Sequence, residues 1–328
     1  MSKPILGTDL PERTRQRRVF QQLGQRSRLS SEATLRDPVG FTKWRRAAVI
    51  AVAIMAFLLP AHAAFAATLD LKRTIRTSPF TGSSVSMGDN EGSAFVPSDN
   101  SLWLADDGKK RIYEVDPTTG ALKRTIVRSV FNDAPRFGGG PAAGTDRTND
   151  FESIAYDRAN DVLYAFSGKC CTSSILPTAF RLTRHSGQFQ VESYQPLPTG
   201  ADYTGAAWSP TDGKIYVGKG RDIRSFDYAS GIASPSFRVG GVSGITGMDF
   251  SPDGADLFVT VNSEKLIRID WATKTVVSGW TFDLTPFGIR DSRAVATIGN
   301  QFFVSDGYDS RPKGDPLRHA VYVFDARG

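Results

Sequence analysis

Two positions of a repeated segment carry the side chains best suited to chemistry. At the first position four of the five copies have an aspartate, in the order Asp89, Asp150, Asp202, Gly244 and Asp291. Two residues later stand Glu91, Glu152, Thr204, Thr246 and Arg293. If the copies surround one axis, six carboxylates converge there, and their repulsion favours bound protons or a bound cation. Carboxylate and hydroxyl oxygens suit Ca²⁺ or Mg²⁺, so we predict a divalent-cation site.

These residues and their neighbours receive the following roles. The predicted metal ligands are Glu91, Glu152, Asp89 and Asp291, and the predicted catalytic bases are Asp150 and Asp306. The predicted substrate-binding residues are Arg293, Lys219, Thr204, Thr246 and Asp106. Two alternatives remain open. Each aspartate can cap its own turn by accepting backbone amides, and Lys219 and Arg293 can pair with neighbouring carboxylates.

The repeated segment that carries these residues has the pattern strand, polar turn, strand. In the copy at 150–166 the pattern predicts strands over Ser153–Tyr156 and Val162–Phe166, separated by a turn over Asp157–Asp161. The copies recur at roughly 40 to 60 residues, a period typical of propeller blades. We therefore predict an all-β fold, a β-propeller of about five four-stranded blades.

The two ends of the repeat region predict how the ring closes. The last copy stops after its third strand, at Ala320–Gly328. The segment 69–77 closely matches 121–129, which ends the first complete copy. We expect strand 69–77 to complete the last blade, because closure removes an exposed sheet edge.

The lengths of the connections distinguish two faces of the predicted ring. The turns between first and second strands are short, and we call their side the plain face. Long irregular segments fall on the opposite side, at Val130–Asn149, Gly168–Thr178 and Ser305–His319. Loops positioned by a rigid scaffold carry function, so we call this side the site face.

Net charge separates the chain into three predicted regions. The total is +6, but residues 1–46 alone carry eleven Lys/Arg and four Asp/Glu, a balance of +7 that leaves about −1 for the rest. We predict a basic disordered leader at 1–46, an export signal or membrane anchor at 47–67 and the propeller at 68–328. The near-neutral repeat region has no nucleic-acid footprint.

The segment 47–67 has the parts of an export signal. An uncharged apolar run, Ala47–Leu59, follows Arg45-Arg46 and precedes the small-residue sites Ala61-His62-Ala63 and Ala64-Phe65-Ala66. The arginine pair resembles a twin-arginine leader, although Ala47-Ala48 departs from the usual Phe-Leu. The alternative is an uncleaved anchor. Either route places the propeller outside the cytoplasm, where we expect a monomer that meets membrane only through 47–67.

The few cysteines and histidines limit other chemistry. Cys170 and Cys171 are adjacent, and a vicinal disulfide is our prediction, with intermolecular pairing and metal binding as alternatives. Beyond the leader only His185 and His319 remain, both expected at the surface, with the alternative that His319, which borders the last long loop, reaches the site. We see no plausible Ser-His-Asp set.

The first two copies resemble a known group of bacterial propellers. Asn90-Glu91-Gly92-Ser93-Ala94-Phe95 and Phe151-Glu152-Ser153-Ile154-Ala155-Tyr156-Asp157 are similar to the Glu-Gly-Ile-Ala-Tyr-Asp openings of SdiA-regulated proteins and phytase-like esterase domains. That group in turn looks like the gluconolactonase propellers. The resemblance implies a divalent cation held by axial acidic residues, with Glu91 and Glu152 in that role. Copies three to five depart from it with Thr204, Thr246 and Arg293.

These observations predict an exported, divalent-cation-dependent hydrolase of a small ester, lactone or phosphoester. The alternative is a non-catalytic propeller at the cell envelope that binds a small ligand or a protein and holds a structural cation.

The leader generates a first testable prediction. If the export signal is cleaved, the mature chain begins near Ala64 or Ala67, after the two small-residue sites. N-terminal sequencing of extracytoplasmic protein measures this start. Membrane-bound protein that begins at Met1 would establish the anchor instead.

Overall fold

The computed structural model describes residues 67–327, apart from 170–175 and 308–309. These residues lie within the second of two units into which the chain divides, at 63–328. The predicted leader up to residue 66, and both cysteines, lie outside the described residues. Over the part of the chain that is described, no helix has the length and apolar character needed to cross a membrane.

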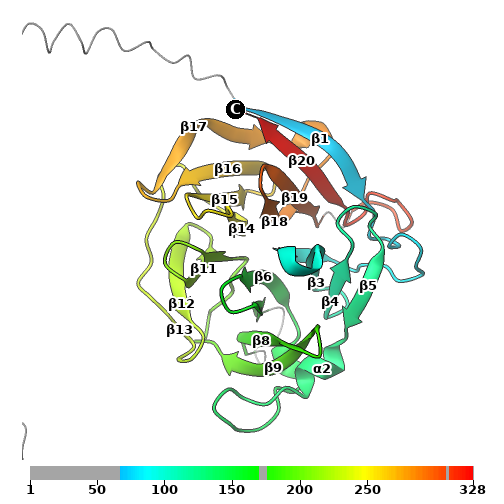
Figure 1. Cartoon of the computed structure of the whole chain (residues 1–328), viewed down its shortest axis with the longest axis vertical. Helices are drawn as coiled ribbons and strands as arrows, with labels where there is room; N and C mark the ends of the chain where they lie inside the picture. Colours follow the sequence, from blue (N-terminus) through cyan, green and yellow to red (C-terminus); the bar gives the residue numbers. More distant parts are fainter. Residues whose placement is uncertain (1–66, 170–175, 308–309, 328) are drawn as a thin grey trace, which may run out of the picture. The chain divides into compact units, whose positions relative to one another are not determined.

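Five four-stranded antiparallel sheets make up the described fold and confirm the predicted five-bladed β-propeller (Figure 1). Blade one contains β2 (Asn90–Val96), β3 (Ser101–Asp106), β4 (Arg111–Val115) and β5 (Leu122–Ile126). Blade two contains β6 (Phe151–Asp157), β7 (Val162–Ser167), β8 (Thr178–His185) and β9 (Gln188–Pro196). Blade three contains β10 (Gly205–Ser209), β11 (Lys214–Lys219), β12 (Asp222–Asp227) and the short β13 (Ile232–Ala233).

The last two blades complete the ring. Blade four contains β14 (Ile245–Phe250), β15 (Asp256–Val261), β16 (Lys265–Asp270) and β17 (Thr275–Asp283). Blade five contains β18 (Ser292–Ile298), β19 (Gln301–Asp306), β20 (Val321–Arg327) and, as its outer strand, β1 (Thr68–Ile75). The innermost strands β2, β6, β10, β14 and β18 contact one another in sequence, and β18 returns to β2.

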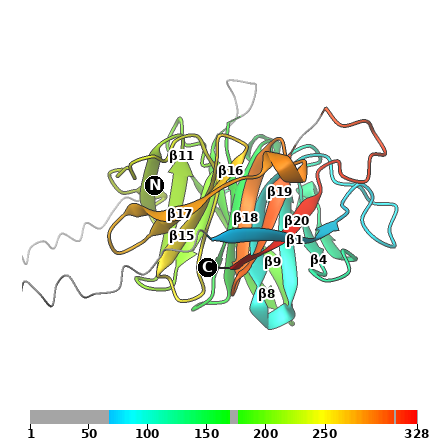
Figure 2. The ribbon, with the colours of Figure 1, turned by 90° about the horizontal axis from the view of Figure 1, so that it is seen from above.

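The predicted closure is confirmed by the pairing of β1 with β20. The two strands run antiparallel from Thr68 opposite Arg327 to Ile75 opposite Val321. Figure 2 shows β1, in blue, beside β20, in red. The strand ends at Ile75 rather than at residue 77, because Thr77 leaves the sheet to bridge Phe80 and to donate its hydroxyl to the His319 carbonyl. The N-terminal strand therefore covers the edge that β20 would otherwise expose.

The blades are held together by apolar layers between neighbouring sheets. Five clusters of buried residues lie in the described chain, one at each blade junction. Phe95, Trp208 and Phe250 occupy equivalent inner-strand positions and belong to three of these layers. The alternation of strand residues sends every second side chain into such a layer, so each blade packs on both of its faces.

One of the segments expected to be irregular contains two short helical turns. Between blades one and two the chain forms α2 (Arg128–Asn132) and the short 3₁₀ turn η2 (Thr145–Arg147). Buried Phe131 in α2 packs edge-on against Phe151 of β6. The rest of residues 130–149 is irregular, and this aromatic anchors the one α-helical turn onto blade two. Two further 3₁₀ turns, η1 (Pro97–Asp99) and η3 (Thr285–Phe287), connect strands elsewhere.

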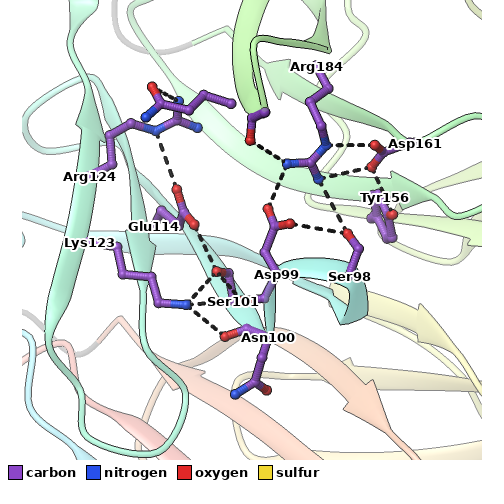
Figure 3. A network of polar contacts seen from close by, with 12 residues as sticks. Ser98, Asp99, Asn100, Ser101, Glu114, Lys123, Arg124, Tyr156, Asp161 and Arg184 are labelled. Carbon is purple, nitrogen blue, oxygen red and sulfur yellow. Dashed lines mark hydrogen bonds and ion pairs between the residues drawn. The ribbon is translucent and has the colours of Figure 1, made fainter.

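On the plain face, a polar network centred on Arg184 joins blades one and two (Figure 3). Its guanidinium donates to Asp161 at 2.7 Å, on its own blade, and to Asp99 at 2.9 Å, on the neighbouring blade. The same group stacks over Phe189 at 4.3 Å, and Asp161 also accepts from the Tyr156 hydroxyl. These charges satisfy one another across a blade junction, and we interpret them as a structural link.

The closure generates a stability prediction. Removing residues 68–77 deletes β1 and exposes β20, so the melting temperature should fall sharply or the protein should aggregate. Removing residues 1–43 provides the control, with an unchanged melting temperature expected. Thermal unfolding measured by circular dichroism compares the two truncations, and equal melting temperatures would contradict the role of β1.

Candidate functional site

The inner strands pack so tightly that the axis is closed. A side-chain carbon added to Gly92 would lie 2.7 Å from the Cα atom of Ser153 on the next blade. One added to Gly247 would lie 2.6 Å from the Cα atom of Ala294. The narrow space between these strands is too small for a water molecule. Side chains that begin the inner strands are therefore confined to the mouth of the axis on the site face.

A β-bulge marks the position of the predicted axial residues. In four blades the pairing of the first two strands skips one residue, and that residue is Glu91, Glu152, Thr246 or Arg293. In blade three β10 begins after Thr204. A bulge turns its extra residue out of the regular alternation, and bulges are common beside active sites. Four of the five residues in the column predicted from the sequence therefore share one backbone feature, the β-bulge.

Three carboxylates gather where blades two and three meet. Asp150, Glu152 and Asp202 each place one oxygen within 4.8 Å of the others. Gly168 makes room for them, because a side-chain carbon there would lie 2.2 Å from an Asp202 oxygen and 3.3 Å from an Asp150 oxygen. At the exposed edge of this group, the Lys219 ammonium forms an ion pair with Asp202 at 3.1 Å. We call Asp150, Glu152 and Asp202 the acidic cluster.

Burial and mutual repulsion hold protons in the acidic cluster. Burial, followed by the charges of Glu91, Asp150 and Asp202, raises the pKa of Glu152 to about 10. Burial and the charge of Asp107 raise the pKa of Asp150 to about 6, although a hydrogen bond from Glu152 opposes this rise. Glu152 therefore carries a proton at neutral pH and shares it with Asp150, unless a cation replaces it.

The other half of the ring is organised around Arg293. Its guanidinium contacts Glu91 at 3.2 Å and Asp291 at 2.7 Å. Burial opposes the charge on Arg293, but Glu91, Asp291 and Asp89 together raise its pKa above the usual range. Burial raises the pKa of Glu91 well above normal, and the nearby guanidinium offsets part of this rise. The predicted ligands Glu91 and Asp291 are thus ion-paired, as the alternative for Arg293 anticipated.

The side chains at the ends of the second strands hold the backbone of the aspartate column. The Asp106 carboxylate accepts from the amides of Gly88 and Asp89, each at 2.9 Å. Ser167 accepts from the Asp150 amide at 3.2 Å, and Asp306 accepts from the Asp291 amide at 3.2 Å. Asp106 and Asp306 are fully buried. These hydrogen bonds position the aspartate column. The substrate-binding role assigned to Asp106 and the base role assigned to Asp306 therefore gain no support from the structure.

The two threonines predicted to bind substrate make hydrogen bonds within the protein. Thr204 donates to the Ile245 carbonyl at 2.6 Å, and the Thr246 hydroxyl lies 3.1 Å from that of Thr260. Both hydroxyls therefore link neighbouring parts of the scaffold, and their assigned substrate roles stay predictions. Cys170 and Cys171 lie outside the described residues.

One histidine differs from its expected surface position. His319 is fully buried, and its Nδ1 atom lies 3.9 Å from an Asp89 oxygen. Its backbone carbonyl accepts from Thr77 and Asn90, which draws the residue under the junction of blades five and one. The expectation of a surface histidine failed because these contacts are made by residues more than 200 positions away in sequence.

Sequence reasoning gave no role to two residues that shape the acidic cluster. Asp202 belongs to the aspartate column but was not assigned as a ligand, and its position in that column was the available signal. Gly168 gave no sequence signal, since nothing in its neighbourhood shows which side chains occupy the space beside it.

The two large cavities found in the described chain open on the plain face. One, of about 660 Å³, lies between blades four and five and is lined by Asp256, Arg268 and Trp280 among others. The second, of about 640 Å³, lies between blades two and three beside Tyr164, Tyr228 and Ile232. Neither includes a member of the acidic cluster.

Comparisons with known proteins identify the fold. No family model matches the sequence, and no curated protein matches it. Similar solved structures include a glutaminyl cyclase from Myxococcus xanthus, at 12% identity and a TM-score of 0.53, covering 79% of this chain and 97% of that one. Regucalcin from Agrobacterium tumefaciens, a calcium-binding protein, has 12% identity and a TM-score of 0.50, covering 79% and 95%.

These likenesses extend over nearly the whole of the similar chains. At 12% identity, the likeness to these two structures shows a shared fold. No match supports the narrower SdiA-regulated or phytase-like assignment. At such low identity the shared property is the fold, so the activity must be argued from the site.

The acidic cluster generates a prediction on pH and stability. Because the folded pKa of Glu152 is raised from 4.5 to about 10, the folded state keeps a proton that the unfolded chain releases. The stabilising contribution of this proton is complete below about pH 4.5 and is lost progressively as pH rises toward 10. In chelator, Glu152→Gln should therefore melt above the original protein at pH 8 to 9.

Thermal unfolding at several pH values measures this effect. Glu264→Gln, a change at an exposed site-face residue, is the control and should follow the original protein. If Glu152→Gln melts at the same temperature as the original at pH 9, the buried-proton interpretation is wrong.

Proposed function

We propose that this protein binds one divalent cation, Ca²⁺ or Mg²⁺, at the acidic cluster and hydrolyses a small ester, lactone or phosphoester outside the cytoplasm. The observation that carries the proposal is the approach of three carboxylates to within 4.8 Å of one another beside a glycine. The export segment at 47–67 motivates the location, and the protein acts as a monomer in this proposal.

The donor set fits a hard cation. Calcium accepts oxygen ligands at about 2.3–2.6 Å, so two ligands on opposite sides of one ion lie up to about 5 Å apart, in line with the spacing of the cluster. The absence of a side chain at Gly168 lets the Asp202 and Asp150 carboxylates occupy the space beside it. A cation would replace the proton that Glu152 otherwise holds. The calcium-binding description of regucalcin, which shares the fold, is consistent with this choice of ion.

The cation and two residues of the chain have separate proposed roles in hydrolysis. When bound, the cation supplies Lewis acidity and lowers the pKa of a water molecule. Asp150 is the candidate base, with a pKa of about 6 in the absence of a cation, and in that role it leaves Glu152 and Asp202 to hold the ion. Lys219 has 47% of its side chain exposed, so it can leave Asp202 and meet an anionic group of the substrate.

The alternative, a ligand-binding propeller with a structural cation, is favoured by one observation. The two large cavities of the described chain lie on the plain face, away from the acidic cluster. In that case the cation stiffens the ring, and a small ligand binds between blades. The two functions differ in whether loss of the cation abolishes turnover or only lowers stability.

Calorimetric titration with Ca²⁺ and Mg²⁺ tests the cation. We expect one ion per chain and an affinity that rises from pH 6 to pH 8, since the ion competes with the Glu152 proton. Gly168→Ala should weaken binding at least about tenfold, because its side-chain carbon would meet Asp202. Gly240→Ala is the matched control, as nothing lies within 4 Å of that position. Equal affinities of the two variants would contradict the assigned site.

Turnover separates the enzyme from the alternative. The protein is assayed on a chromogenic phosphoester, a chromogenic acetate ester and a small lactone, with cation and with chelator. We expect cation-dependent hydrolysis of one class and its loss in Asp202→Asn. A cation-bound protein that hydrolyses none of the three classes would support the binding function.

A further inference from the structure

Blades four and five place very different side chains at equivalent positions. In blade four, Trp271 donates its amide to the Ala255 carbonyl at 2.9 Å. In blade five, Ala326 donates its amide to the Asn300 carbonyl at 3.0 Å. Both donors directly follow an aspartate of the third strand, and both acceptors lie in the turn between the first and second strands. An indole in blade four therefore corresponds to a methyl group in blade five.

The indole of Trp271 fills the space between blades three and four. Trp271 is only 5% exposed, and its ring centroid lies 4.7 Å from that of Tyr216 and 4.7 Å from that of Phe250. Tyr216 is the third residue of β11 in blade three, and Phe258 is the third residue of β15 in blade four. The space that corresponds to the Trp271 indole is therefore the one between Phe258 and Ala326.

The cavity of about 660 Å³ between blades four and five lies in this space, because Phe258 and Ala326 both line it. Buried Phe302 and half-buried Trp280 complete its aromatic wall. The Trp280 ring centroid lies 6.1 Å from that of Phe258 and 6.4 Å from that of Phe302. The volume falls within the range of about 300–1,000 Å³ that is usual for ligand pockets.

The cavity between blades two and three does not have this origin. Tyr228 follows Asp227 as Trp271 follows Asp270, and each aspartate carbonyl accepts the amide four residues later, at 2.9 Å. The Tyr228 ring centroid lies 5.3 Å from that of Tyr164. An aromatic ring thus holds this position in blades three and four, and blade five lacks it.

The charges around the cavity between blades four and five balance. The Arg268 guanidinium pairs with Asp256 at 2.8 Å and lies 4.8 Å from the centre of the Trp280 ring. Exposed Asp253 and Arg327 add one further charge of each sign. Because the lining carries both signs in equal number, it favours a neutral ligand over one with a net charge.

We propose that this cavity binds a small, neutral, planar aromatic compound of about the size of an indole, in the place that the Trp271 side chain fills one blade earlier. Aromatic rings pack favourably edge-to-face or offset at the centroid distances found here, and Phe258 and Trp280 supply such partners. Asn300 and the charged groups of the lining can bind a polar edge of the ligand. The inference goes beyond the proposed hydrolysis and does not depend on it, since the lining contains no member of the acidic cluster.

Calorimetric titration of the full-length protein with indole, in the presence of chelator, tests the inference. We expect saturable binding of indole and weaker binding of tryptamine and indole-3-acetate, which carry a net charge. Bound indole should also raise the melting temperature by mass action. The absence of saturable indole binding, or tighter binding of either charged compound, would overturn the inference. Binding of maltose in place of indole would overturn it as well. Because chelator removes free cations, failure of the proposed hydrolysis leaves these results unaffected.

Two tryptophan substitutions locate the bound compound. Ala326→Trp supplies the missing ring from the protein itself and should weaken indole binding at least about tenfold. Ala272→Trp adds the same side chain at an exposed position outside the cavity lining, so it should bind indole like the original protein. If Ala326→Trp does not fold, Ala326→Leu narrows the cavity less and should still weaken binding. Unchanged affinity in a folded Ala326 variant, or an equal loss in Ala272→Trp, would overturn the inference.

Discussion

The close approach of five inner strands is the constraint on which the rest of the site depends. Small residues such as Gly92, Ser153 and Gly247 allow neighbouring strands to pack until the axis admits no water. The axis has no room for the polar side chains that begin the inner strands, so these side chains crowd together at the end of the axis on the site face. There they are partly removed from water, and like charges interact more strongly than they do in bulk solvent.

The ring resolves this crowding in two ways. Around Arg293 the anions are neutralised by a positive charge within the protein, at the expense of burying a guanidinium. At the acidic cluster no described guanidinium is in contact, and protons shared between Glu152 and Asp150 reduce the repulsion. A proton is easily exchanged for a metal ion, whereas an arginine is not. The two halves of one mouth therefore differ in what they can bind.

The fold itself leaves the activity open. A glutaminyl cyclase and a calcium-binding regucalcin share it, so the common property is the fold and not one activity. In this chain the second-strand residues Asp106, Ser167 and Asp306 fix the backbone of the aspartate column. The precision of the site therefore comes from the scaffold, and its chemistry from the few side chains that the scaffold turns toward the mouth.

The sequence by itself determined the architecture. The spacing of the copies and the alternation within each strand are local properties, and they predict the blades, their inward order and the closing strand. The same alignment placed Glu91 and Glu152 at the start of inner strands, where they lie. These features are readable because each depends on residues a few positions apart.

Only the tertiary structure decided which charges meet. Arg293 reaches Glu91 across 202 residues because closure brings blade five against blade one, and no local pattern contains that contact. Asp202 joins Asp150 and Glu152 because Gly168 leaves space between blades, and His319 is buried by partners on the first blade and the segment before it. Electrostatic interactions depend on distances of a few ångströms, and those distances are set by the packing of blades rather than by order along the chain.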